Sequence, residues 1–235
     1  MPNVDRKWLP PALIVAAIAA SVAVYAQLPE MVSLRLDGLV PFELPKDDEP
    51  APRWVAAFLV PALTLVVWMG FRLAPTAAGQ RFARVLFRNA QEQVTQPEQF
   101  ERFGKTYDAI VLAVVLLLLG IHAALLAAVL TDSGIGARIA SIVLGGCLLL
   151  MGNVMPRLRP NWVAGVRTRR TLEDPQLWRV THRVLGTALV VSGLITIVVG
   201  LAAPQYGFVT GIAMLLASCV VAGVASLRAK AVAPV

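Results

Sequence analysis

Residues 107–130 read YDAIVLAVVLLLLGIHAALLAAVL, a run of 24 residues whose polar side chains are Tyr107, Asp108 and His122. At 1.5 Å per residue, a helix of about 20 residues crosses a hydrocarbon core about 30 Å thick. Lipid offers no partner to backbone N–H and C=O groups, so a segment that crosses it in this way must be helical. The stretch therefore predicts a transmembrane helix.

Similar apolar runs surround this one. They lie at residues 10–27, 54–73, 139–154, 184–203 and 206–227. The chain has 235 residues, of which 57% are apolar and 15% charged, whereas a soluble domain has about 45–50% and about 25%. This composition excludes a soluble enzyme and a disordered chain. We predict an all-α fold, a polytopic membrane bundle of about six transmembrane helices.

The distribution of Lys and Arg residues predicts the orientation of this bundle. The two tails and the second and fourth connections hold 17 of the 21 basic residues. Basic residues are enriched on the cytoplasmic side of membrane proteins. We therefore expect both termini to be cytoplasmic, in a bacterial inner membrane. Topology accounts for the net charge of +7, so we expect no direct binding of nucleic acid.

The first run has an alternative interpretation as a cleaved signal peptide. Arg6 and Lys7 precede it, and Val24-Tyr25-Ala26 resembles a small-residue cleavage site. Against cleavage, the run is long for a signal peptide, and its opening pair of prolines suits the first turn of a retained helix.

The connections suggest three units. Residues 1–75 form a two-span N-terminal unit whose exterior loop is rich in proline and acidic residues. Residues 76–106 are expected to form a cytoplasmic interfacial helix, because Arg81, Arg84 and Arg88 share one helical face beside apolar residues. Residues 107–235 form a four-span unit with a basic loop at 152–186.

That loop has the most distinctive sequence in the chain. It carries seven Arg residues together with two Trp and two Asn. Asp174 and Pro175 predict a helix start that continues directly into the fifth span. On this helix Trp178 and His182 are four residues apart and share a face. We expect Asn153, at the end of the fourth span, to face them.

The order of motifs in this loop resembles the SdpI family of bacterial membrane proteins. The motifs are Gly152-Asn153, Arg159-Pro160-Asn161, Gly165-Val166-Arg167-Thr168, Thr171-Leu172, Trp178 and Thr181-His182-Arg183. The N-terminal two-span unit resembles, more weakly, a domain that often precedes this signature. Two departures are notable. Ser33 and Arg35 stand where the family has Pro and then His, and Arg169-Arg170 replaces the frequent Pro-Trp.

The resemblance implies a receptor or immunity-type protein. Such a protein gives resistance to an extracellular antimicrobial peptide, sequesters a cytoplasmic transcriptional repressor, or does both. The residues implied in partner or ligand binding are Asn153, Arg159, Asn161, Arg167, Thr168, Thr171, Trp178, Thr181, His182 and Arg183. The alternatives are a small transporter or lipid-handling protein that uses this loop as an inner gate, and a membrane scaffold.

The sequence predicts no catalytic or cofactor chemistry. It contains no phosphate-binding loop or metal-ligand spacing, so we expect no cofactor and no metal. Serines within the spans, such as Ser21, have no base nearby in the sequence. His122 lies midway along a predicted span, where ionisable residues usually face the bundle interior. A structural role and a proton relay both remain open for it.

Overall fold

A computed structural model describes residues 8–32, 50–74, 76, 104–131, 134–160 and 165–228. Most of the predicted exterior loop and of the predicted interfacial helix at 76–106, together with Asn161, lie outside these residues. The long helices are α1 (Leu9–Val24), α2 (Arg53–Leu73), α5 (Gly104–Leu130), α6 (Ile135–Val154), α8 (Pro175–Ala202) and α9 (Pro204–Arg228). The short elements are η1 (Tyr25–Gln27), β1 (Met31–Val32), β2 (Ala51–Pro52), η3 (Met155–Arg157) and α7 (Arg169–Glu173).

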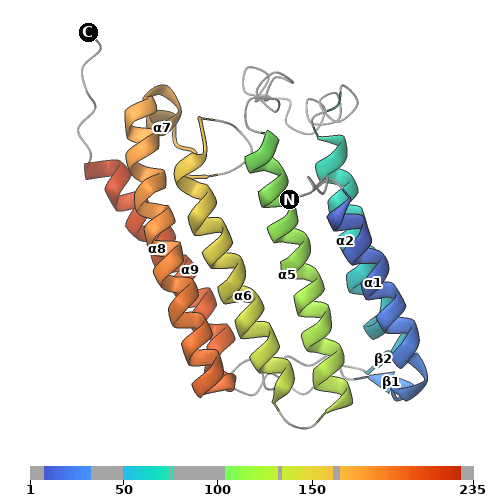
Figure 1. Cartoon of the computed structure of the whole chain (residues 1–235). Helices are drawn as coiled ribbons and strands as arrows, with labels where there is room; N and C mark the ends of the chain where they lie inside the picture. The colour runs from blue at the N-terminus through green and yellow to red at the C-terminus, as the bar shows by residue number, and fades with distance from the viewer. Residues whose placement is uncertain are drawn as a thin grey trace, which may run out of the picture.

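All six long helices are long and apolar enough to cross a membrane, which confirms the predicted all-α membrane bundle. They run alternately up and down, so the start of α1 and the end of α9 lie at the same end of the bundle (Figure 1). We refer to it as the α7 end, because α7 lies there too. Large apolar side chains such as Val66, Val198 and Leu216 are exposed, as expected for helices surrounded by lipid.

Local sequence chemistry sets several helix boundaries. Pro10 and Pro11 stand in the first turn of α1, as predicted. Asp174 caps α8, which continues without a break from Pro175 through the predicted fifth span. The fourth span was predicted to begin at residue 139, but α6 begins at Ile135, directly after Gly134. Gly134 has φ +67°, a conformation that glycine adopts without steric cost.

Glycines hold α6 and α8 in direct backbone contact. A Cβ added to Gly193 would lie 2.5 Å from the carbonyl oxygen of Gly145, and a Cβ on Gly152 would lie 2.7 Å from that of Gly186. Farther along, Gly200 of α8 packs on Ser141 of α6. Small residues allow this close approach, which supplies dispersion contacts where lipid removes the hydrophobic driving force between helices. The four-span unit is therefore built around one tightly packed helix pair.

Polar contacts tie the N-terminal helices to this unit at one end of the bundle and to each other at the opposite end. At the α7 end, the Tyr107 hydroxyl of α5 donates a 2.6 Å hydrogen bond to the Phe71 carbonyl of α2. At the other end, β1 and β2 pair antiparallel, with Met31 opposite Pro52. The Arg53 guanidinium lies 4.8 Å from the ring centroid of Tyr25. The short β1–β2 pair was not predicted, and it brings together the two ends of the predicted exterior loop.

Candidate functional site at the signature loop

Two capping arrangements fix the chain between α6 and α8. Thr168 and Thr171 form a capping box at the start of α7. The Thr171 N–H donates to Thr168 Oγ1 (3.2 Å), and the Thr168 N–H donates to Thr171 Oγ1 (2.9 Å). Asp174 Oδ1 then accepts from the N–H groups of Gln176 (2.8 Å) and Leu177 (3.1 Å). These contacts satisfy backbone donors that a helix start leaves unpaired.

The aromatic ring of Trp178 ties the end of η3 to α8. It is fully buried, and its Nε1–H donates a 2.8 Å hydrogen bond to the Leu158 carbonyl. One turn later, the His182 ring stacks on it, with ring centroids 3.9 Å apart and planes at 19°. The predicted shared face of these two residues is confirmed, and that face is turned into the protein.

His182 holds the second half of the loop through one of its two ring nitrogens, Nε2. Its Nδ1 lies 2.8 Å from the Trp178 carbonyl, and its Nε2 accepts a 3.1 Å hydrogen bond from the Val166 N–H. Because Nε2 accepts and a carbonyl can only accept, the proton must be on Nδ1, in a neutral imidazole. We call Leu158, Val166, Trp178 and His182 the loop clamp.

Gly165 is the residue that lets the loop reach His182. Its φ is +108°, and a Cβ at this position would overlap His182 Nε2. Two independent constraints, the backbone conformation and the close approach of the ring, therefore require glycine here. In the Gly-Val-Arg-Thr motif, Gly165 contacts the imidazole and the Val166 N–H donates to it. Arg167 is the next residue along the chain.

The predicted site residues thus fall into two sets. Thr171, Trp178, Thr181 and His182 are fully buried, and the hydrogen bonds of Thr171, Trp178 and His182 hold the loop in place. Thr181 Oγ1 finds no hydrogen-bond partner within the described part of the chain. The second set is exposed and consists of Asn153, Arg159, Arg167, Thr168 and Arg183. Among the described site residues, this second set lies at the surface, where a partner can reach it without movement of the loop.

The exposed face of the loop is strongly basic. Among the described residues, the side chains of Arg157, Arg159, Arg167, Arg170, Arg179 and Arg183 are all exposed. Arg170 Nη1 contacts the Leu227 carbonyl at 3.5 Å, which links α7 to the end of α9. Guanidinium groups present several donors in a planar fork suited to carboxylates and phosphates. The surface is therefore suited to an anionic partner.

The prediction that Asn153 faces Trp178 and His182 is wrong. The preceding residue, Gly152, makes the close contact with Gly186 of α8. Successive residues on a helix are about 100° apart, so Asn153 is turned away from α8. It is exposed and lines a separate apolar groove of about 720 Å³ between α1, α5 and α6.

A buried polar pair outside the loop was missed by the sequence analysis. Ser21 Oγ of α1 lies 2.7 Å from His122 Nε2 of α5, and both side chains are buried. The Ser21 hydroxyl also donates to the Ala17 carbonyl at 3.0 Å, so it accepts from the histidine. His122 Nδ1 has no partner among the described residues. The interior position of His122 is confirmed, and an imidazole lies close to Ser21 in space, with its protonated Nε2 facing the hydroxyl.

Metal binding has no support from the described ranges. Across residues 8–32, 50–74, 76, 104–131, 134–160 and 165–228, no group of three or more His, Cys, Asp or Glu side chains is placed to hold an ion. Buried Cys147 donates to the Ala113 carbonyl at 3.4 Å. This cysteine packs as a small core residue.

Six spanning helices and a basic, clamped loop between α6 and α8 define a multi-pass bacterial membrane protein. The chain belongs to the SdpI/YfhL protein family, whose model matches residues 157–227. It is 31% identical to the uncharacterized protein YfhL of Bacillus subtilis (strain 168) over 83 residues, which are 34% of this chain and 76% of that protein. It is 22% identical to the immunity protein SdpI of the same organism over 217 residues, 91% of this chain and 90% of that protein. No solved structure matches.

Proposed function

We propose that the chain is an immunity-type membrane receptor, which gives resistance to an antimicrobial peptide and sequesters a cytoplasmic transcriptional repressor on its basic loop. The observation that supports this proposal most directly is the division of the signature residues into buried residues beneath the loop and an exposed basic face. The clamp fixes the backbone at Leu158 and Val166. Arg159 and Arg167 follow directly and are exposed.

This division suits protein recognition. Guanidinium groups on an exposed face can be reached by a partner, and their planar fork can pair with its carboxylates in bidentate fashion. A rigid backbone beneath them reduces the conformational entropy lost on binding. In this proposal Arg159 and Arg167 contact the repressor, while Thr171, Trp178 and His182 act as positioning residues.

The peptide is proposed to act at the opposite end of the bundle. The loop between β1 and β2 contains Asp37, Glu43, Asp47, Asp48 and Glu49, a composition suited to a cationic peptide. For the peptide to change repressor binding, it must prefer one arrangement of the helices over another. The receptor proposal therefore predicts that peptide and repressor binding are linked.

The test combines a survival assay with a capture assay. A strain that lacks the gene is grown in medium conditioned by the parent strain, and survival is measured with wild type, Arg167→Ala or Arg138→Ala supplied. Tagged versions are also purified from conditioned cells, and the bound proteins are identified. Arg138 is an exposed arginine near the start of α6, at the opposite end of the bundle from α7, so Arg138→Ala is a matched control.

We expect wild type and Arg138→Ala to protect the cells and to capture a small DNA-binding protein. Arg167→Ala should lose that capture by at least about tenfold while its abundance stays normal, since surface changes alter stability little. Equal capture by both variants would contradict the proposal that the basic loop binds the repressor. Equal survival with and without the gene would reject the immunity role.

Transport, with the loop as an inner gate, is the competing function. It predicts flux of a labelled solute in liposomes that depends on His122, the buried ionisable group nearest the middle of α5. Solute flux in wild type that is abolished in His122→Ala would favour transport over the receptor proposal.

A further inference from the structure

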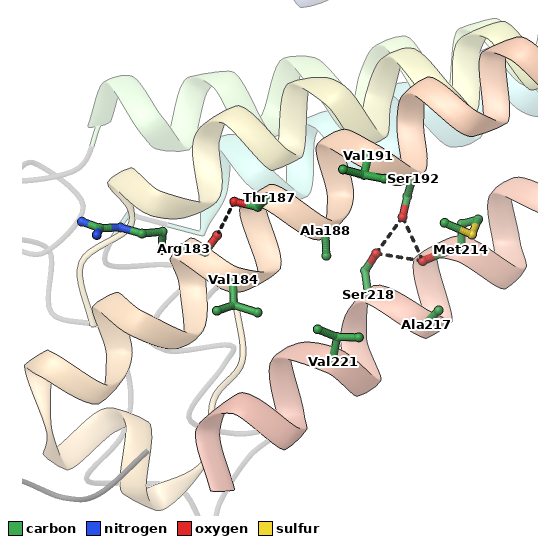
Figure 2. Close-up of a pocket in the computed structure, with 10 residues that line it drawn as sticks. All are labelled: Arg183, Val184, Thr187, Ala188, Val191, Ser192, Met214, Ala217, Ser218 and Val221. Carbon is green, nitrogen blue, oxygen red and sulfur yellow. Dashed lines mark hydrogen bonds between the residues drawn. The ribbon is translucent and has the colours of Figure 1, made fainter. Parts of the chain in front are cut away.

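An apolar groove of about 530 Å³ lies between α8 and α9 (Figure 2). Its walls are formed mainly by Val184, Ala188, Val191, Ala217 and Val221. Figure 2 shows Arg183 at one end of the groove and the serine pair Ser192 and Ser218 at the other. The two ends therefore differ in charge.

The serine end offers no free polar group to a ligand. Ser192 Oγ and Ser218 Oγ lie 2.9 Å apart, and both contact the Met214 carbonyl, at 3.2 and 2.8 Å. These hydrogen bonds are all internal to the α8–α9 pair. A polar group placed here would lose its hydration without gaining a strong hydrogen bond in return. The interior of the groove therefore favours a hydrocarbon chain.

The other end offers a cation. The Arg183 side chain is exposed. The groove-lining Thr187 hydroxyl donates to the Arg183 backbone carbonyl at 3.1 Å, so this hydrogen bond does not engage the guanidinium group. Arg179 lies one turn closer to the start of α8 and is also exposed. Both arginines belong to the α7 end, where lipid head groups lie if the six helices cross a bilayer.

The length of the groove matches one leaflet of a membrane. Arg183 and Ser192 are nine positions apart on α8, which corresponds to about 14 Å along a helix. Half of a hydrocarbon core is about 15 Å. An acyl chain lying in the groove would therefore place its head group beside Arg183.

We propose that this groove binds one acyl chain of an anionic phospholipid whose phosphate pairs with Arg183. Charge decides between this occupant and a second copy of the chain. Neither α8 nor α9 contains an Asp or Glu residue, so the same face of a second copy has no carboxylate for Arg183. A phospholipid supplies both the apolar chain and the anion.

The test uses the full-length chain in phosphatidylcholine vesicles that contain a trace of spin-labelled lipid. The label is carried in turn on phosphatidylglycerol and on phosphatidylcholine, and electron paramagnetic resonance measures the motionally restricted fraction of each. Three variants are compared with wild type: Arg183→Gln, Ala217→Phe and Arg228→Gln. Arg228 is exposed at the same end of the bundle but does not line the groove.

We expect wild type to retain phosphatidylglycerol about fivefold more strongly than phosphatidylcholine, as expected for one arginine beside an anionic head group. Arg183→Gln should abolish this preference, and Arg228→Gln should keep it. Ala217 is exposed, so Phe there should fill the groove without unfolding the helix pair, and it should reduce the restricted fraction of both lipids.

Three results would overturn the proposal. The first is equal retention of the two lipids by wild type. The second is an equal loss of preference in Arg183→Gln and Arg228→Gln, which would indicate general attraction to a basic surface. The third is a change of oligomeric state in Ala217→Phe with lipid retention unchanged, which would assign the groove to a second copy of the chain.

Discussion

His182 accepts a hydrogen bond from the Val166 N–H at 3.1 Å, across 16 positions of sequence. This contact ties the Gly-Val-Arg-Thr motif directly to α8, and the other ring nitrogen, Nδ1, is engaged with the Trp178 carbonyl. The imidazole is thus a bridge between a helix and a loop, and its function depends on one tautomer.

Replacing His182 with Ala should release the loop. The change removes a buried ring stacked on Trp178 and leaves the Val166 N–H without its acceptor. We expect a loss of about 2–4 kcal/mol in the free energy of unfolding. Hydrogen exchange in detergent should show faster exchange at the Val166 amide. Arg179→Ala, an exposed change one turn away, is the control. Unchanged protection of that amide would contradict the bridge.

Gly165 and Gly134 offer a matched pair of variants. Both have positive φ, but only Gly165 has a neighbour, His182, in the space of a Cβ. Gly134→Ala should lower the free energy of unfolding by about 1 kcal/mol through backbone strain alone. Gly165→Ala should lower it by clearly more, because the ring must also move. Thermal unfolding of the two variants measures the difference, and equal losses would show that the ring accommodates the methyl group.

The contact between α6 and α8 predicts a sharp contrast between neighbouring glycines. Gly145 and Gly193 meet backbone to backbone, whereas Gly146 has open space at its Cβ position. Gly193→Ala should destabilise the protein by about 1–3 kcal/mol through overpacking. Gly146→Ala should be neutral or slightly stabilising, because alanine favours a helix more than glycine does. Similar melting temperatures for the two variants would contradict the packing described.

Ser21 and His122 should be energetically coupled. A double-mutant cycle of Ser21→Ala and His122→Ala, measured by unfolding in detergent, is expected to give a coupling energy of about 0.5–1.5 kcal/mol. A value near zero would indicate that the two helices do not depend on this hydrogen bond. Proton flux measured in liposomes with the same variants would separate the two roles of His122, since a purely structural role predicts no flux that depends on it.

Much of the fold could be predicted from the sequence because long apolar runs and helix caps are local signals. The start of α8 at Asp174 and Pro175 needed only neighbouring residues. The contacts between Ser21 and His122 and between Val166 and His182 join positions far apart in sequence, so they depend on how the helices rotate and pack. The predicted orientation of Asn153 toward Trp178 and His182 was wrong for this reason. The small residue beside it, Gly152, was the available signal for the face toward α8.

The glycine contacts also restrict how a signal can pass along this bundle. Gly186 and Gly193 are seven positions apart on α8 and face Gly152 and Gly145, also seven positions apart on α6. A slip of α8 by one position would bring a larger side chain against backbone at both levels simultaneously. The two helices can therefore pack this closely in only one axial position relative to each other. A conformational switch that keeps this contact must move α6 and α8 together as a rigid body, and the movement must take place relative to the other helices.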